Sequence, residues 1–449
     1  MKDEYDHKNQ KVPQKDAKPS ETGNGVVFFN KLTNVPKAQN NANLKSLDML
    51  FKTSLTNDKK PNAAIFMVFG YSIENIHQLY TNGTKVIMLA DPRINDYNAL
   101  KAQENIDKNL KLLWVEKDSN IKNTAFHPKL YLLKFDLFLR VVIGSGNLFP
   151  EDWTVWSNIF WTKDFPFTLD SSTSKTCDFK LQLEAFAKLS MGAKYTELKK
   201  FLGIDLKDYD FSKAGVNLIY SIPIKKDISN IKESYGYEQL ISLMKNNEPS
   251  KPYNFDNTKI YYSCSCIGGV NFGMVYQFIT SIIPSLKSDK FVDFKAQQKY
   301  FNMLRLIYPT KSYINGLGVK NTNTGCLFFN KKTYHKINFN ADILTQFENN
   351  ETVYGDENIV SHSKVFIVLH GSKVDDDTVI YIGSHNFTKS AWGKISRGKY
   401  EIWNHELGVI FPAEKGSASL KRDIISKLSF KIPASDYDEN DQPFFTVDN

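Results

Sequence analysis

Two segments of this chain carry the same polar residues at nearly the same spacing. Residues 127–147 read H-P-K, then an apolar stretch, then G-S-G-N. Residues 362–386 read H-S-K, then an apolar stretch, then G-S-H-N. In both copies a tryptophan follows the asparagine at the same interval, as Trp153 and Trp392. The chain therefore contains a duplicated unit rather than two chance motifs.

The spacing within each copy predicts which side chains meet. Residues two apart in a strand share a face, so each histidine is predicted to point the same way as the lysine after it. An antiparallel strand would then bring the asparagine back beside them. Two imidazoles, two ammonium groups and two amides are predicted to converge, from His127, Lys129, Asn147, His362, Lys364 and Asn386.

This set of groups suits phosphodiester cleavage without a metal ion. One imidazole can attack phosphorus, and the other can protonate the leaving oxygen and then activate water. The lysines and asparagines can hold the non-bridging oxygens as charge redistributes. The alternative, ordinary hairpins with satisfied histidines, does not explain why a lysine recurs on an apolar strand face, where its burial is costly. An inactive relative that only binds nucleic acid stays open as an alternative, although both copies are intact.

Strands alternate with helical patterns around both copies. Buried strands are predicted at 63–70, 85–90, 110–115, 216–220, 260–262 and 304–309. Helices are predicted at 44–51, 72–80 and 237–244, and a loop at 311–332. This alternation predicts an α/β protein. We expect a disordered tail at 1–25, a first domain at 26–214 and a second at 215–449, each with one H-x-K motif.

Composition restricts the class of protein further. The net charge is +8 over 449 residues, and 52 of the 57 basic residues are lysines. Such an excess fits contact with an anionic polymer and plain solubility equally well. No apolar run reaches the roughly 18 residues that span a bilayer, and the polar start predicts no secretory signal. Four cysteines without a C-x-x-C pair indicate a reduced intracellular protein, with buried thiols at Cys264 and Cys266 on one predicted strand.

The motifs resemble those of a known superfamily. An H-x-K pair is the mark of the phospholipase D superfamily, in most of which an aspartate stands five residues after the lysine. Lys134 and Leu369 occupy those positions here. With an asparagine downstream in each copy, the chain resembles the tyrosyl-DNA phosphodiesterase branch. Segments 139–148, 304–309, 384–393 and 405–409 support the same branch, in consistent order between about residues 28 and 412.

The resemblance implies a fold and an activity. The fold would be two similar α-β-α sandwich domains with mixed sheets, related by a pseudo-two-fold axis, with the active site at their interface. The activity would be hydrolysis of the bond between a DNA 3′-phosphate and the tyrosine of a stalled topoisomerase I, or removal of other 3′-blocking adducts, through a covalent phosphohistidine and without metal or cofactor. The partners would be single-stranded or duplex-end DNA and a topoisomerase-derived peptide. A nuclear monomer is expected, with the mitochondrion or cytoplasm as further compartments.

The resemblance also implies roles for individual residues. His127 would be the nucleophile and His362 the general acid and then base, while Lys129, Lys364, Asn147 and Asn386 match the phosphate-binding set. Glu406 matches a carboxylate that hydrogen-bonds within the site and would fix an imidazole tautomer. Asn158 stands where the family usually has glutamine, on a shorter stem. Substrate contacts are assigned to Ser145, Asn158, Ser265, Cys266, Lys331, Ser384 and Thr388.

One alternative function and one departure from the family pattern also bear on this resemblance. A phospholipase or general nuclease of the same superfamily would call for an apolar lipid channel or the missing aspartate. The family's stacking phenylalanine has no clear match, because Phe126 directly precedes His127 in the wrong register. His385 is a further candidate for lining the site, and His405 is expected to be structural.

Overall fold

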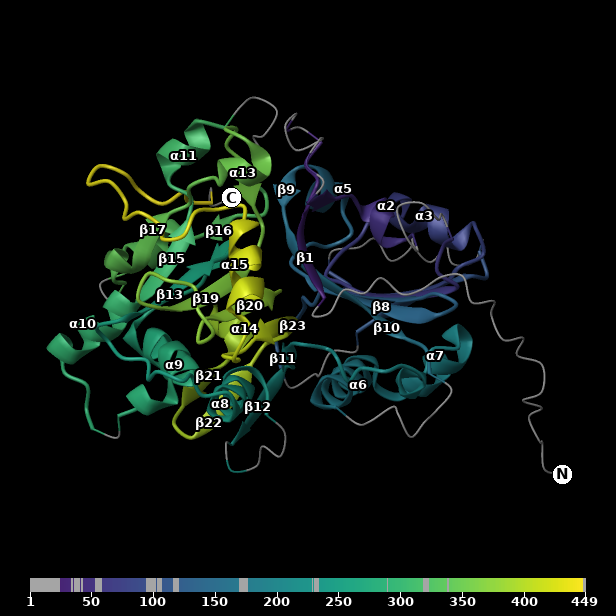
Figure 1. Ribbon diagram of the computed structural model, residues 1–449, viewed down its shortest axis with the longest axis horizontal. Coiled ribbons are helices and arrows are strands. Elements are labelled where there is room, and N and C mark those ends of the chain that lie inside the picture. The colour runs from purple at the N-terminus through teal and green to yellow at the C-terminus, as the bar shows by residue number, and fades with distance from the viewer. Residues whose placement is uncertain are drawn as a thin grey trace.

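The computed structural model describes residues 25–446, apart from residues 34, 36–40, 42, 53–58, 94–101, 103–106, 116–120, 169–176, 228, 230–233, 289, 318–322 and 337–338. All of the predicted tail except Gly25 lies outside the described residues. Two large mixed sheets form the body of the protein, one in each half of the chain (Figure 1).

The first sheet has eight strands in the order β2-β1-β10-β8-β7-β3-β4-β5. Its bounds are β1 Val26–Asn30, β2 Leu44–Lys45, β3 Ala63–Met67, β4 Lys85–Ala90, β5 Leu110–Trp114, β7 Leu130–Lys134, β8 Phe138–Gly144 and β10 Ile159–Pro166. The hairpin β7–β8 is antiparallel, while β3, β4 and β5 run parallel.

The second sheet repeats this arrangement in the order β11-β23-β20-β19-β13-β15-β17, with β6 added beside β23. Its bounds are β6 Ala125–Phe126, β11 Asn217–Ser221, β13 Thr258–Ser263, β15 Leu304–Tyr308, β17 Leu344–Gln346, β19 Val365–His370, β20 Val379–Gly383 and β23 Asn404–Phe411. The hairpin β19–β20 is antiparallel, and β13, β15 and β17 run parallel. Strand order and direction therefore match the first sheet position by position, from β1 and β11 to β5 and β17.

Shorter strands complete the fold. They are β9 Trp156–Ser157, β12 Ile224–Asp227, β14 Cys266–Ile267, β16 Phe328–Phe329, β18 Val360–Ser361, β21 Lys394–Ser396 and β22 Lys399–Ile402. Two short pairings join the halves: β6 of the first half pairs with β23, and β9 of the first half pairs with β18. Each joint leads directly into one H-x-K motif.

Helices cover the sheets. Their bounds are α2 Leu47–Leu50, α3 Glu74–Tyr80, α5 Pro150–Thr154, α6 Asp178–Met191, α7 Tyr195–Leu202, α8 Gly236–Asn246, α9 Phe272–Ile282, α10 Phe294–Met303, α11 Lys311–Asn315, α12 Lys331–Tyr334, α13 Glu351–Tyr354, α14 Lys389–Trp392 and α15 Ala418–Ser426. In the first half, the sheet lies between α2 and α3 on one side and α6 and α7 on the other (Figure 1). A separate cluster of buried apolar side chains covers each face of the first sheet. The cluster that includes residues of α6 continues through the second sheet. Burial of this shared core holds the halves in a fixed relation.

Most predicted elements are confirmed. The strands at 63–70, 85–90, 110–115, 216–220, 260–262 and 304–309 are observed as β3, β4, β5, β11, β13 and β15, and the helices at 72–80 and 237–244 as α3 and α8. The predicted boundary between residues 214 and 215 falls between α7 and β11.

Three predictions of local structure were wrong. The helix at 44–51 is divided, because Leu44 and Lys45 pair with β1 before α2 begins. The stretch 311–332 contains α11, β16 and the start of α12, whose N-caps Thr310 and Asn330 accept backbone hydrogen bonds and so stabilise helix starts in a polar sequence. Cys264 and Cys266 do not share one strand, since β13 ends before the first and β14 begins at the second.

Candidate active site

The H-x-K motifs lie just before β7 and β19 rather than within them, which corrects the prediction that the strands themselves carry them. The extended segment is held from the opposite half. The His127 amide donates to the His405 carbonyl at 3.0 Å, and the His362 amide donates to the Ser157 carbonyl at 2.9 Å. The joints β6–β23 and β9–β18 thus place both histidines at the boundary between the halves.

The first histidine is oriented by a carboxylate of the second half. His127 Nδ1 lies 2.8 Å from Glu406 Oε2, although the two residues are 279 positions apart. Ser384 Oγ donates to the same oxygen at 2.5 Å, and Asn404 Nδ2 donates to Oε1 at 3.0 Å. Burial opposes ionisation, but His127 outweighs it and lowers the pKa of the Glu406 carboxyl to about 2. An ionised Glu406 keeps the proton of His127 on Nδ1 and leaves Nε2 as the basic nitrogen.

The second histidine is oriented by the first half. His362 Nδ1 lies 3.1 Å from Asn158 Oδ1 and 3.1 Å from Asp152 Oδ1. Asn158 therefore reaches the imidazole despite its short stem. Asp152 is fully buried. Burial by itself would raise the pKa of the Asp152 carboxyl, but the hydrogen bond and the charge of His362 have the larger effect, so the pKa is lowered. Each imidazole thus takes its acceptor from the other half of the chain.

Both lysines are buried beside the histidines. Lys129 Nζ donates to the His127 carbonyl at 2.8 Å, and Lys364 Nζ donates to the His362 carbonyl at 2.6 Å. Burial lowers the pKa of Lys364 to about 8, and burial together with the neighbouring Lys364 charge lowers the pKa of Lys129 well below its ordinary value. Burial and these ammonium groups in turn lower the pKa of both histidines. The pKa of His362 is lowered to about 3. The two lysines are therefore desolvated cations, and burial and charge repulsion disfavour further protonation of the histidines beside them.

The asparagines complete the predicted set. Asn147 is buried, and its Oδ1 has no hydrogen-bond partner among the described residues. Asn386 Oδ1 accepts from the Cys266 amide at 3.0 Å and from Ser265 Oγ at 3.3 Å. The segment assigned to substrate contact therefore lies directly against the second repeat.

The two repeat serines contact the acceptors of the histidines. Ser145 and Ser384 are fully buried. Ser145 Oγ donates to Asn158 Oδ1 at 2.8 Å, as Ser384 Oγ does to Glu406. Both hydroxyls therefore hydrogen-bond the acceptors that contact the histidines.

Two further residues were assigned to substrate contact, Thr388 and Lys331. Thr388 caps α14, its Oγ1 accepting from the Ala391 amide at 3.1 Å. Lys331 is exposed at the start of α12, the helix that follows β16 beside the Cys266 strand.

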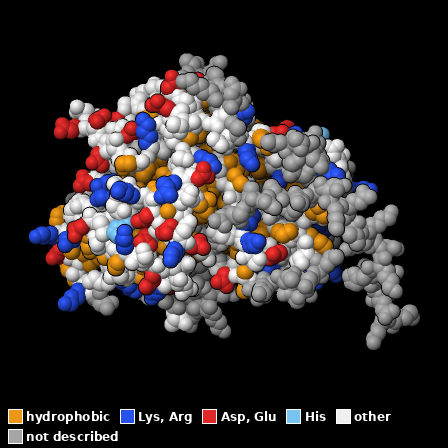
Figure 2. All heavy atoms as spheres, in the orientation of Figure 1, with side chains coloured by type: hydrophobic (Ala, Val, Ile, Leu, Met, Phe, Trp, Pro, Cys, Tyr) orange, Lys and Arg blue, Asp and Glu red, His pale blue; other side chains and the backbone are white. Residues whose placement is uncertain are grey.

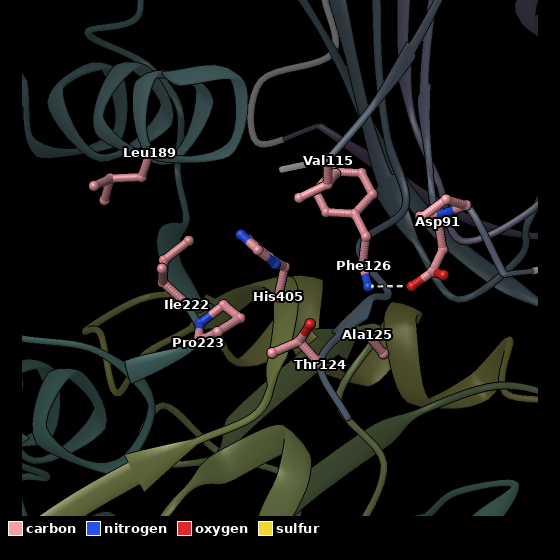
Figure 3. Close-up of a pocket in the computed structure, with 10 residues that line it drawn as sticks. Asp91, Val115, Thr124, Ala125, Phe126, Leu189, Ile222, Pro223 and His405 are labelled. Atoms are coloured by element: carbon pink, nitrogen blue, oxygen red, sulfur yellow. Dashed lines mark hydrogen bonds between the residues drawn. The ribbon is translucent and has the colours of Figure 1, made fainter. Parts of the chain in front are cut away.

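The other buried histidines are structural. His385 is enclosed rather than lining the site: Nδ1 lies 2.6 Å from the Tyr381 hydroxyl, Nε2 lies 3.1 Å from Ser221 Oγ, and the ring stacks on Trp392. His405 and Phe126 turn away from the site, because each directly precedes a site residue in extended backbone, where neighbouring side chains point to opposite faces. They line a separate cavity of about 150 Å³ on the opposite face of the β6–β23 pair (Figure 3). There the Phe126 amide donates to Asp91 Oδ2 at 2.8 Å, so Phe126 is part of a structural joint.

Sequence reasoning missed three residues of the site. Asp152 is the most important, and its signal was its place between Asn147 and Trp153 within the repeat. Phe69 lies near the end of the predicted strand 63–70, just beyond β3, and its ring meets the His127 ring edge-on with centroids 5.4 Å apart. Trp156 lies 5.8 Å from the His362 ring. Each histidine is thus flanked by one half-buried aromatic ring.

Comparisons with known proteins agree with this geometry. Residues 27–446 match the family model for tyrosyl-DNA phosphodiesterase. Tyrosyl-DNA phosphodiesterase 1 of Drosophila melanogaster is 23% identical over 340 residues, covering 71% of this chain and 56% of the relative. The Arabidopsis thaliana protein of the same name is 22% identical over 298 residues, covering 64% of this chain and 46% of the relative. The chain thus spans about half the length of these curated relatives.

The fold comparison covers nearly the whole chain. The crystal structure of yeast tyrosyl-DNA phosphodiesterase superposes with a TM-score of 0.70 at 15% identity, covering 94% of this chain and 100% of the yeast chain. Two large mixed sheets that meet at paired histidine–lysine motifs place the chain in the phospholipase D superfamily. Within that superfamily, the chain belongs to the tyrosyl-DNA phosphodiesterase family.

Proposed function

We propose that this chain hydrolyses the phosphodiester bond that joins tyrosine to a DNA 3′ end. His127 Nε2 attacks phosphorus, and the bond from phosphorus to the tyrosine oxygen breaks as His362 Nε2–H gives its proton to that oxygen. Water then attacks the phosphohistidine, passing one proton to His362 while the nitrogen–phosphorus bond breaks. The products are tyrosine, or a peptide that contains it, and a DNA 3′-phosphate.

The observation that carries this proposal is the crossed support of the two imidazoles. Glu406 and the Asp152–Asn158 pair occupy the two Nδ1 atoms, so both Nε2 atoms are left for chemistry. The charges of Lys129 and Lys364 also lower the pKa of both imidazole rings. A nucleophile, a proton donor and a phosphate-binding centre are therefore available in one place.

The charges explain how His362 gains the proton it must donate. Burial and the neighbouring Lys364 ammonium group lower the pKa of His362 to about 3. A bound phosphodiester places a negative charge among the two lysines and offsets their repulsion of an imidazolium. Asp152 is then the fixed partner of the charged ring. Substrate binding is thus coupled to proton uptake by His362.

Several features support DNA as the substrate. Ser265 Oγ and the Cys266 amide form a hydrogen-bonded cluster with Asn386 in the second repeat, and hydroxyls and amides of this kind suit phosphate oxygens. The relatives are named for tyrosyl-DNA bonds. The proposal includes a topoisomerase I-derived peptide on the tyrosine side, other 3′ adducts as further substrates, a monomeric state and a nuclear location. In the described part of the chain, no helix has the length and apolarity of a membrane span.

The test uses a single-stranded oligonucleotide with a 3′-phosphotyrosine, incubated in EDTA. Wild type should release tyrosine and leave a 3′-phosphate, whereas His127→Ala should be inactive. His362→Ala should accumulate a covalent protein–DNA adduct, because the acid–base group for hydrolysis is absent. His335→Ala, which changes an exposed histidine, serves as the matched control. No cleavage by wild type, with or without added metal, would refute the proposal and favour a binding-only relative.

A further inference from the structure

The cavity beside His405 lies between the two halves of the chain. Its volume is about 150 Å³, which accommodates one six-membered ring (Figure 3). The face of the molecule in Figure 2 carries side chains of both charges, whereas the wall of this cavity is mainly apolar. The apolar side chains of the wall are Pro92, Val115, Phe126 and Leu189 of the first half and Ile222 and Pro223 of the second. The His405 cavity therefore has the room and the surface to bury a small molecule.

The His405 imidazole is an unused hydrogen-bonding group in this wall. The residue is only 8% exposed, and its Nδ1 has no hydrogen-bond partner among the described residues. Figure 3 shows the ring pointing into the space between Leu189 and Val115. Burial outweighs the opposing effects of Glu406, the Ala125 carbonyl and Asp91, and lowers the pKa of His405 to about 4. The ring is therefore neutral near pH 7, with one N–H donor and one bare nitrogen that can accept.

The other charges of the wall are already compensated. Arg93 Nε donates to Asp91 Oδ1 and Arg93 Nη2 donates to Asp91 Oδ2, each at 2.8 Å. The Phe126 amide donates to the same Oδ2 at 2.8 Å. A neutral His405 and a paired Asp91 give no reason for an ionic ligand to leave water for this cavity. A water molecule would in turn find few polar partners along the apolar walls.

Aromatic packing makes a ring the best fit. The Phe126 and His405 rings meet edge-on, with centroids 5.2 Å apart, and so form a corner against which a third ring can pack. Leu189 of α6 is 41% exposed, so the wall on this side borders solvent and a ligand can enter without opening the core.

We propose that the His405 cavity binds a small neutral molecule with one six-membered aromatic ring and one O–H or N–H donor, such as phenol. The donor pairs with the bare nitrogen of His405, and the ring packs between the two halves. The site is separate from the catalytic centre, because the side chains of His405 and Glu406 point to opposite faces of β23. Its occupant braces the β6–β23 joint, where the His127 amide donates to the His405 carbonyl at 3.0 Å.

The test adds phenol to the full chain, and in parallel toluene, which has a similar shape but no hydrogen-bond donor. Nitrogen-15 NMR of labelled histidines reports the pairing, and the His405 signals are assigned by their loss in His405→Gln. Phenol should shift the signal of the bare His405 nitrogen and raise the melting temperature, because a ligand that binds the native state stabilises it. Toluene should shift that signal much less. Bound phenol that leaves the His405 signals unmoved, or an equal shift with toluene, would overturn the proposal.

Calorimetric titration of variants locates the bound phenol. Leu189→Trp fills the cavity from the exposed side of α6, so it should weaken phenol binding at least about tenfold while the melting temperature stays unchanged. Leu181→Trp is the matched control, because Leu181 lies on the same helix, is 48% exposed and does not line the cavity. It should bind phenol as wild type does, and so should His362→Ala. Loss of binding in His362→Ala would place phenol in the catalytic centre. That result, full binding by Leu189→Trp, or no saturable binding by wild type would overturn the proposal.

Discussion

Replacing Glu406 with glutamine should slow formation of the covalent intermediate by about 100-fold. Three donors converge on this carboxylate: His127 Nδ1 at 2.8 Å, Ser384 Oγ at 2.5 Å and Asn404 Nδ2 at 3.0 Å. A glutamine can keep its oxygen toward the first two donors only by turning its NH2 group toward Asn404. The better orientation of the variant therefore retains geometry but loses the negative charge.

The magnitude follows from the two shared contacts. Hydrogen bonds to charged groups contribute about 1.5–3 kcal/mol, against about 0.5–1.5 for neutral ones, so two of them lose about 2–3 kcal/mol. The imidazole gains positive charge as Nε2 bonds to phosphorus, so much of this loss falls on the transition state. At about 1.4 kcal/mol per tenfold, the rate falls by about 30- to 160-fold.

The assay is single-turnover formation of the protein–DNA adduct, trapped in the His362→Ala background. Glu401→Gln is the matched control, because Glu401 forms a surface ion pair with Lys225 at 3.5 Å. It should change the rate less than twofold. A Glu406→Gln rate within threefold of its parent, with an unchanged melting temperature, would refute the view that Glu406 orients and stabilises His127.

Three further perturbations follow from the same site. Asp152→Asn should lower kcat by about tenfold, because one charge-assisted hydrogen bond to His362 is lost while Asn158 still accepts from the ring. Steady-state kinetics with Glu151→Gln as the control measure this effect, and a rate within twofold of wild type would contradict it. In a pH series, kcat/KM should fall above about pH 8, because the lowered pKa of Lys364 removes its ammonium charge there; a plateau to pH 9.5 would argue against it. Thermal melting should show that stability decreases from pH 6.5 toward about pH 4. Buried His385 and His405 each have a pKa of about 4, so in this range they take up protons only when the protein unfolds. His385→Gln should flatten this slope, and an unchanged slope would contradict the assignment.

The histidine–lysine pairs and most of the framework could be identified from the sequence alone. His127 with Lys129 and His362 with Lys364 were identifiable because a duplicated motif is visible without knowledge of the fold. Strands such as Ala63–Met67 and Lys85–Ala90 were equally clear. A buried parallel strand is a continuous apolar run, and that signal is local.

Only the tertiary structure decided which groups hold those pairs in place. Glu406 was suspected from resemblance, but its partner is fixed by a strand joint between residues 279 positions apart. Asp152 reads as an ordinary helix-start carboxylate until the fold buries it against His362. The His405 cavity likewise exists only where the two halves meet, because both contribute to its wall. Such roles depend on what a side chain faces across the molecule, and local spacing carries no record of that.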